Sequence, residues 1–131
     1  MSRFLLDTHV VLWLAISPDR IPAALRDRLA GAEQLFVSPA SAYELAQKAR
    51  AGRLPQAGAV LARWGELLEL MVASELAMTG SEMLLAGTMH WEHRDPFDRL
   101  IVAQAQMYGL SLVSKDRAIL GFEGVDCAEW R

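Results

Sequence analysis

The residues best suited to chemistry are four acidic side chains at predicted junctions of strands and helices: Asp7, Glu44, Asp98 and Asp116. Asp7 follows the apolar run 4–6, and Asp116 follows the apolar run 110–114. If these runs are neighbouring parallel strands, both carboxylates lie at the carboxyl edge of one sheet, where open α/β sheets place their ligands. Carboxylates that share a site repel one another, and a hard divalent cation such as Mg²⁺ or Mn²⁺ relieves that repulsion. This chemistry points to phosphate substrates.

Each acidic residue also has a purely structural explanation. The first and last of the four can cap the helices that follow them, because Asp is a favoured N-cap. Asp95 and Asp98 together form a helix start, with both charges at the positive end of the helix dipole. Glu44 can pair with Lys48 four residues later. Taken singly these explanations are favoured, but the placement of all four on one side of a sheet favours a metal site.

The composition sets limits on the class of protein. The 131 residues are enough for one domain, which we assign to residues 1–131, and a hydrophobic fraction of 53% is ordinary for a globular chain. A net charge of −3 excludes nonspecific binding of nucleic acid over the whole surface, so an RNA contact needs a local basic patch. The single cysteine, Cys127, fits a reducing cytoplasm. No apolar window is long enough to span a membrane, and Asp7 and His9 interrupt the only stretch that resembles a signal peptide.

Apolar runs and helix signals alternate along the chain, which predicts an α/β fold. Strands are expected at 3–6, 35–37 and 110–114, with shorter ones within 72–78 and 125–127. Helices are expected at 10–17, 22–31, 39–51, 57–70, 81–89 and 96–108, and directly after Asp116. Strands that alternate with helices imply a mainly parallel sheet with right-handed crossovers.

Histidine and basic residues surround the acidic positions. His90 and His93 have helical spacing, but a pair without a third ligand is weak evidence for zinc, and a structural or substrate-orienting role is favoured. The sequence does not decide whether His9 faces the site or solvent. Arg99 and Lys115 directly neighbour proposed ligands, and we expect them to contact backbone phosphates.

Four segments of the chain carry a resemblance to a known family. They are Phe4-Leu5-Leu6-Asp7-Thr8-His9, Ser41-Ala42-Tyr43-Glu44-Leu45, the segment 93–105 and the segment 109–116. In this order and spacing they resemble a PIN-domain ribonuclease. The block His93-Arg94-Asp95-Pro96-Phe97-Asp98-Arg99 is typical of the bacterial VapC-like toxins in that group.

The resemblance implies a Rossmann-like three-layer α/β/α sandwich and an acidic metal site for Mg²⁺ or Mn²⁺, made of Asp7, Glu44, Asp98 and Asp116. Asp95 is a fifth acidic residue, and its role as ligand or helix cap is open. Ser114 stands where many relatives carry threonine, and we expect its hydroxyl near the bound substrate.

The activity that the resemblance implies is metal-dependent hydrolysis of RNA phosphodiester bonds, by an endoribonuclease that acts as the toxin of a toxin–antitoxin pair. The implied partners are the RNA substrate, a small antitoxin that inserts into the acidic site, and a second copy in a homodimer.

Other classes of protein fit the sequence less well. A haloacid-dehalogenase-type phosphatase needs a second aspartate two residues after the first, where this chain has His9. A dinucleotide-binding enzyme needs a Gly-rich first turn, which is missing. The remaining alternative is a non-catalytic PIN-like module that binds RNA or another partner, since a fold does not guarantee an activity. Structured DNA is the alternative substrate, although a small chain without an added arch or clamp favours RNA.

Overall fold

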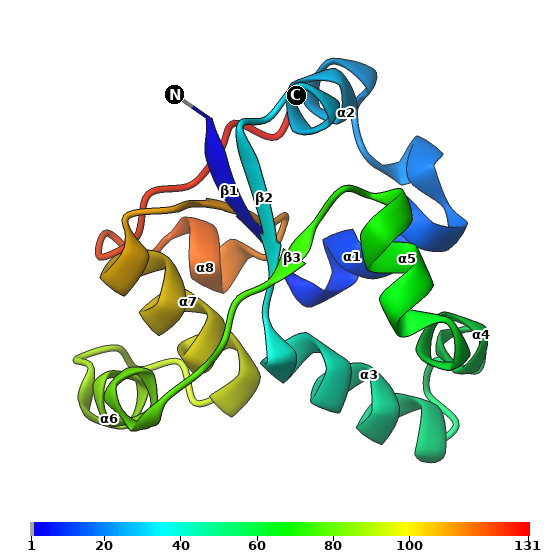
Figure 1. Cartoon of the computed structure of the whole chain (residues 1–131). Coiled ribbons are helices and arrows are strands. Elements are labelled where there is room, and N and C mark those ends of the chain that lie inside the picture. Colours follow the sequence, from blue (N-terminus) through cyan, green and yellow to red (C-terminus); the bar gives the residue numbers. More distant parts are fainter. Residues whose placement is uncertain (1) are drawn as a thin grey trace.

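A four-stranded parallel sheet forms the centre of the computed structural model, which describes residues 2–131 (Figure 1). The strands are β1 (Arg3–Leu6), β2 (Gln34–Val37), β3 (Ser74–Glu75) and β4 (Ser111–Val113). Their order in the sheet is β3-β2-β1-β4, and every neighbouring pair is parallel. The chain therefore builds outward from β1 to β3 and then returns to place β4 on the other side of β1. The gap between the carboxyl ends of β1 and β4 is the topological switch point, where this class of sheet binds ligands.

Helices cover both faces of the sheet, because successive residues of each buried strand point to opposite faces. Phe4 and Leu6 belong to one hydrophobic cluster, and Leu5 belongs to the other. The helices that pack on the first cluster are α1 (Thr8–Ile16), α2 (Ala23–Ala30) and α5 (Trp64–Leu70). The helices that pack on the second are α7 (Pro96–Tyr108) and α8 (Arg117–Leu120), with α6 (Gly80–Thr88) against the outside of α7. The predicted three-layer α/β/α sandwich is confirmed.

A third, smaller cluster lies beyond the carboxyl edge of the sheet. It joins Leu12 of α1 to Leu45 of α3 (Pro39–Arg50) and Val60 of α4 (Ala57–Ala62). All three side chains are buried, and burying one such side chain contributes about 1.5–3 kcal/mol. As a result, α3 lies across the end of β2 and faces the switch point (Figure 1).

Two helix predictions need correction. The single helix expected at 57–70 is two helices, because Arg63 leaves helical geometry with φ −122° and ψ 26°. This break lets Trp64 pack against two different clusters, so tertiary packing overrides the continuous helical pattern. A 3₁₀ turn at Pro18–Arg20 also follows α1, where only a break was expected. None of the helices within residues 2–131 has the length and apolar character needed to cross a membrane.

Two predicted strands are longer than the strands that the structure contains. The strand expected within 72–78 is only Ser74–Glu75, and Val72 just before it has a positive φ of 53° that is incompatible with a strand. The strand expected at 125–127 is a single parallel bridge between Leu112 and Cys127. Its backbone bonds run from Leu112 to the neighbours of Cys127, so the pairing is correct but does not extend.

Candidate metal centre

Asp7 and Asp116 lie at the switch point, and the hydroxyl of Ser114 joins them. Asp7 is buried and follows β1, where its Oδ1 accepts a hydrogen bond of 2.8 Å from the Thr8 amide. Its Oδ2 accepts 2.7 Å from Ser114 Oγ, which in turn accepts 3.0 Å from the Asp116 amide. Ser114 is only 1% exposed, so its hydroxyl fixes the ends of β1 and β4 relative to each other. The hydroxyl thus lies at the site and is bonded to Asp7 and to the Asp116 amide, and its contact with the substrate stays a prediction.

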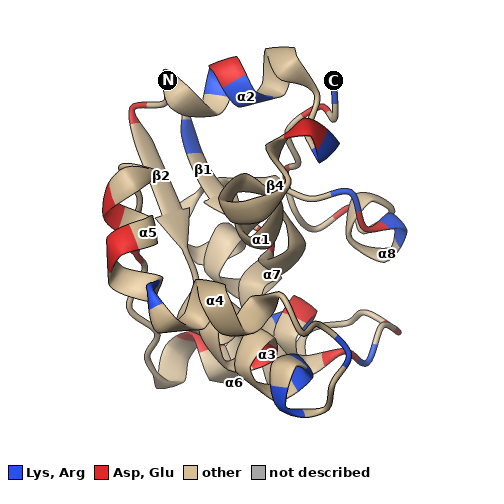
Figure 2. Cartoon of the chain, turned by 90° about the vertical axis from the view of Figure 1, so that its right-hand side faces the viewer, with Lys and Arg blue, Asp and Glu red and all other residues tan. Residues whose placement is uncertain are grey.

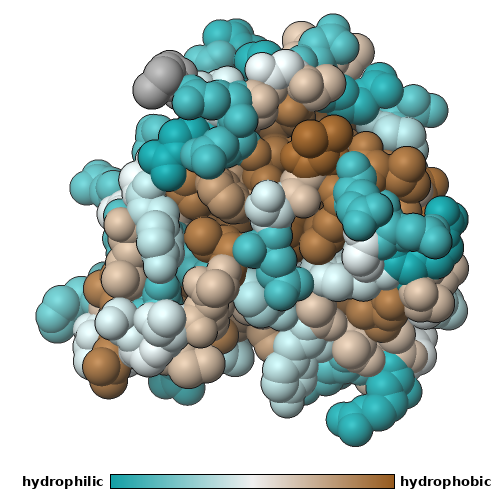
Figure 3. All heavy atoms as spheres, in the orientation of Figure 1, coloured by the Kyte–Doolittle hydropathy of each residue, from teal (hydrophilic) through white to brown (hydrophobic). Residues whose placement is uncertain are grey.

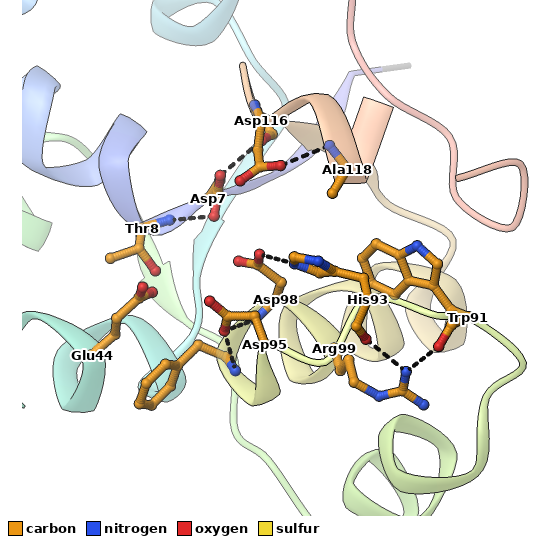
Figure 4. Close-up of polar contacts among 12 residues, drawn as sticks. Asp7, Thr8, Glu44, Trp91, His93, Asp95, Asp98, Arg99, Asp116 and Ala118 are labelled. Atoms are coloured by element: carbon orange, nitrogen blue, oxygen red, sulfur yellow. Dashed lines mark hydrogen bonds and ion pairs between the residues drawn. The ribbon is translucent and has the colours of Figure 1, made fainter. Parts of the chain in front are cut away.

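Asp116 caps α8 and keeps one carboxylate oxygen available. Its Oδ1 accepts a hydrogen bond of 2.8 Å from the Ala118 amide. Its Oδ2 accepts none from residues 2–131, and the side chain is exposed. Figure 4 shows the carboxylates of Asp7 and Asp116 directed toward the same space.

The N-terminus of α7 brings two further aspartates and a histidine together. Asp95 Oδ1 caps the helix and accepts hydrogen bonds from the Phe97 and Asp98 amides at 2.9 and 3.2 Å. Asp98 is buried, and its Oδ2 lies 2.7 Å from Nε2 of His93. One potential ligand atom from each of His93, Asp95 and Asp98 lies within 4.8 Å of the others. Asp95 therefore caps the helix with Oδ1 and also offers a carboxylate oxygen to the cluster of potential ligands.

Glu44 approaches the same space from α3. The side chain is 3% exposed, and its Oε2 pairs with Lys48 Nζ at 2.7 Å, the i,i+4 pair that the sequence indicates. Its Oε1 is buried and accepts no hydrogen bond. A bond of 3.0 Å between the hydroxyls of Thr8 and Ser41 fixes α3 against the start of α1, close to Asp7. In Figure 4 the Glu44 carboxylate points toward Thr8 and the aspartates.

The carboxylates are close enough to perturb one another's protonation. Burial raises the pKa of Asp7, despite its hydrogen bonds from Ser114 and Thr8, and the charge of Glu44 raises it further. Burial also raises the pKa of Asp98 to about 7, against the opposing hydrogen bond from His93. Three further charges add to that rise: Asp7, Asp95 and Asp116. The five carboxylates thus form one electrostatic unit, although they come from four separate segments of the chain.

The chemistry of this donor set fits a divalent cation. Most of the candidate atoms are carboxylate oxygens, which are the preferred ligands of Mg²⁺ and Mn²⁺. Glu44 Oε1 is the clearest indication, because a buried charged oxygen without a partner is costly unless a ligand satisfies it.

Arg99 does not face this centre. Its guanidinium forms four hydrogen bonds of 2.7–3.0 Å to the backbone carbonyls of Ala86, Met89, Trp91 and His93. The structure therefore corrects the prediction that Arg99 contacts phosphate: it holds the loop that carries His93, in the arrangement that Figure 4 shows. Trp91 stiffens the same loop by stacking on Phe122, with ring centroids 4.6 Å apart.

Lys115, the other predicted phosphate contact, does lie at the site. It is exposed and lines a cavity together with Asp7 and Asp116. Figure 2 shows basic residues on both sides of an acidic one at α8, so positive charge lies directly beside the carboxylates.

Sequence reasoning left His93 without a definite role, although its imidazole is the nearest partner of Asp98. The spacing of five residues between His93 and Asp98 crosses a helix start, so no helical or strand period connects them. The one signal in the sequence for a contact between His93 and Asp98 is the position of the histidine just before the Asp95 cap.

Comparisons with known proteins agree on the fold. The family model of the PIN domain matches residues 4–125. The curated protein "Ribonuclease VapC22" from Mycobacterium tuberculosis is 33% identical over 119 residues, which cover 91% of each chain. A DNA-bound VapBC from Salmonella typhimurium has a similar structure, with a TM-score of 0.71, 18% identity and complete coverage of both chains. VapBC2 from Rickettsia felis, bound to a promoter DNA fragment, has a TM-score of 0.67 at 11% identity over 98% of both chains.

Proposed function

Because this chain belongs to the PIN-domain family, we propose that it is a metal-dependent endoribonuclease and the toxin of a toxin–antitoxin pair. The observation that carries the proposal is the convergence of five carboxylates at the switch point, with Glu44 Oε1 buried and unsatisfied among them. A cluster of this kind has no structural purpose that a neutral cap would not serve better.

The ligands of the proposed cation are Asp7, Glu44, Asp98 and Asp116, with Asp95 as a further candidate. When bound, Mg²⁺ or Mn²⁺ supplies a Lewis acid that activates water and offsets negative charge on the scissile phosphate. The chain itself supplies the orientation. Ser114 holds Asp7 and Asp116 in register, and α3 brings Glu44 to them.

His93 acts as a positioning residue in this proposal. Its Nε2–H donates to Asp98 Oδ2 and directs the carboxylate into the site, and such outer partners orient metal ligands in many proteins. Arg99 keeps His93 in place by binding the carbonyls of its loop. Lys115 is exposed beside Asp116 and is the proposed contact for an RNA phosphate.

A small antitoxin is the proposed protein partner, which the VapBC complexes among the similar structures support. An apolar hollow of about 350 Å³ lies between α2 and α5 and offers a surface for it. Exposed hydrophobic side chains such as Leu70 and Val72 border this hollow, where Figure 3 shows apolar residues gathered. Apolar surface of this kind is characteristic of protein contacts. A homodimer stays a prediction, which light scattering of the purified protein would test.

The decisive experiment incubates the purified protein with tRNA and ribosomal RNA, with Mg²⁺, with Mn²⁺, and with a chelator. We expect internal cleavage only with the metals, and none by the Asp98→Asn variant. Cleavage that persists in the chelator, or in a folded Asp98→Asn variant, would contradict the proposal.

One observation favours the alternative of a non-catalytic binding module. The ion pair between Glu44 and Lys48 neutralises one ligand without a metal. A protein that binds RNA but neither binds Mg²⁺ or Mn²⁺ nor cleaves would establish that alternative.

A further inference from the structure

A cavity of about 290 Å³ adjoins the carboxylates, and the metal chemistry above does not use most of it. Its lining residues are Asp7, His9, Val10, Trp13, Lys115 and Asp116. Two of them are proposed metal ligands, so anything in the cavity lies directly beside the scissile phosphate. His9 and Trp13 come from the first turns of α1 and face the same space as Asp7.

Part of the cavity wall is aromatic, and neighbouring side chains hold it in place. The rings of His9 and Trp13 lie 5.9 Å apart at an angle of 46°. Trp13 is held by two further neighbours, an edge contact with Trp130 at 5.9 Å and the guanidinium of Arg20 at 5.7 Å from its centroid. A fixed aromatic wall loses little entropy when a flat ligand packs against it.

The rim carries an available cation. Lys115 is exposed and forms no ion pair with any residue in the range 2–131. The cavity thus combines an aromatic wall and a free ammonium group beside a proposed phosphate-binding cation. These are the features by which proteins hold single-stranded nucleic acid, through stacking of bases and contacts to the backbone.

The size of the cavity restricts what enters it. Its volume of about 290 Å³ is just below that of typical small-ligand pockets, which begin at about 300 Å³. That is enough for one flat heterocycle with its sugar but not for a base pair. In a duplex the bases are stacked inside, so only an unpaired nucleotide reaches such a wall.

We propose that this cavity is a nucleotide subsite, which takes the unpaired nucleotide beside the scissile phosphate, with its base against His9 and Trp13 and its phosphate at Lys115. The proposal rests on the proposed ribonuclease function and adds which residues of this chain hold the base and the phosphate of that nucleotide.

Direct binding tests the subsite without relying on cleavage. The chain has three histidines, so their ring signals in an NMR spectrum can be assigned by single substitutions. At pH 8, with Mg²⁺ present, we expect adenosine and uridine to shift the ring signals of His9 but not those of His90. Inorganic phosphate alone should not reproduce the shift. Absence of any His9 shift with all four nucleosides would overturn the proposal, whether or not the protein cleaves RNA.

Kinetics then separates base binding from metal binding. His9→Ala should raise KM for a single-stranded hexaribonucleotide by roughly 5- to 100-fold, the equivalent of losing one stacking contact. Its effect on kcat should be smaller, and its affinity for Mn²⁺ in calorimetry should equal that of the wild type. His90→Ala, which alters an exposed histidine outside the cavity, is the matched control.

Three results would contradict the subsite. Equal KM values for His9→Ala and His90→Ala would show that the wall does not contact the substrate. A parallel loss of Mn²⁺ affinity in His9→Ala would place His9 in the metal site instead. If His9→Ala weakens only the binding of a protein partner, the cavity is a protein contact. By contrast, a wild type that shifts His9 with nucleosides yet never cleaves RNA would refute the ribonuclease function and keep the subsite.

Discussion

Glu82 at the start of α6 and Asp98 at the start of α7 occupy the same position of their helices, three residues after the N-cap, and both are buried. Glu82 turns back and accepts hydrogen bonds from the amide and hydroxyl of its cap, Thr79, and its other oxygen accepts 2.6 Å from Tyr108. Asp98 turns away from its cap toward His93 and the other carboxylates. Hydrogen bonds, of which the one from the Thr79 side chain has the largest effect, lower the pKa of Glu82 to about 2. Burial instead raises the pKa of Asp98 to about 7.

The difference shows how a structural acid is distinguished from a candidate ligand. Around Glu82, donors satisfy both carboxylate oxygens, so the ionised form stabilises the junction of α6 and α7. Around Asp98, the ionised form is buried next to other negative charges, and an added cation is needed to offset the free-energy cost of ionisation. Both residues look like first-turn acids in the sequence, and the identity of the groups that each one faces decides its role.

The largest expected effect comes from Asp98→Asn. Removal of this charge should lower kcat by at least roughly 10²–10³-fold, the usual cost of losing one group that stabilises charge in a transition state. In a chelator the variant should melt at a higher temperature than the wild type, because the folded state no longer contains a carboxyl that resists ionisation. Since the pKa of Asp98 is raised in the folded state, this advantage should grow as the pH rises from about 4 to about 7.

Thermal melts of both proteins across that range, in a chelator, provide the measurement. A variant that is less stable than the wild type at pH 7 would mean that Asp98 is held as a structural acid after all, like Glu82.

The next effect concerns the histidine that Asp98 faces. His93→Ala should weaken Mn²⁺ binding by about 10- to 100-fold, the range for losing an outer partner of a metal ligand. His93→Gln should recover much of the affinity, because its amide nitrogen can donate the same hydrogen bond. Calorimetry with Mn²⁺ measures both, and His90→Ala is the control for an exposed histidine.

Unchanged Mn²⁺ affinity in His93→Ala would contradict the positioning role. Nitrogen coupling in the electron paramagnetic resonance spectrum of the Mn²⁺-loaded wild type would contradict it in another way, since His93 would then be a direct ligand.

Glu82→Gln should have the opposite profile to Asp98→Asn. It should lower the melting temperature by roughly 5 °C, because a neutral amide replaces a charge-assisted hydrogen-bond acceptor, and it should leave metal affinity and kcat at their wild-type values. The folded-state pKa of Glu82 is lowered, so its contribution is present above pH 4.5 and is lost as the pH falls toward about 2. The difference in melting temperature between the variant and the wild type should therefore disappear as the pH falls through that range.

An exposed acid, Glu66, gives the matched control as Glu66→Gln. Loss of metal binding in Glu82→Gln would break the distinction between the two helix starts.

The sequence predicted the fold well where local signals and tertiary packing agree. The strands before Asp7 and Asp116, the helix from Pro96 to Tyr108 and the sandwich all follow from apolar runs and caps. Predictions failed where distant contacts decide, as at Arg63, where Trp64 packs into two clusters, and at residues 125–127, where only one bridge forms.

In the candidate site, too, local signals predicted some features and distant contacts decided others. The strand edge brought Asp7 and Asp116 together as predicted, because parallel strands fix that geometry. The sequence could not reveal that Arg99 turns to four carbonyls while Lys115 stays exposed, since each is the immediate neighbour of a proposed ligand. Side-chain direction there depends on the loop before α7, which no periodic pattern describes.

The smallest effect concerns Lys48, whose ammonium group pairs with the proposed ligand Glu44. Lys48→Met leaves Glu44 buried and unpaired, so the metal-free protein should be less stable. The same change removes a positive charge from the neighbourhood of the metal, and Mg²⁺ should bind roughly three- to tenfold more tightly. The stability lost in a chelator should then return as Mg²⁺ is added, because the cation replaces the ammonium group as the partner of Glu44.

The exposed pair of Arg63 and Glu66 supplies the control, since Arg63→Met should change neither the stability in a chelator nor the affinity for Mg²⁺. If Lys48→Met weakens Mg²⁺ binding instead, Lys48 holds Glu44 in its binding position, and Glu44 then resembles the fully bonded Glu82 more than it resembles Asp98.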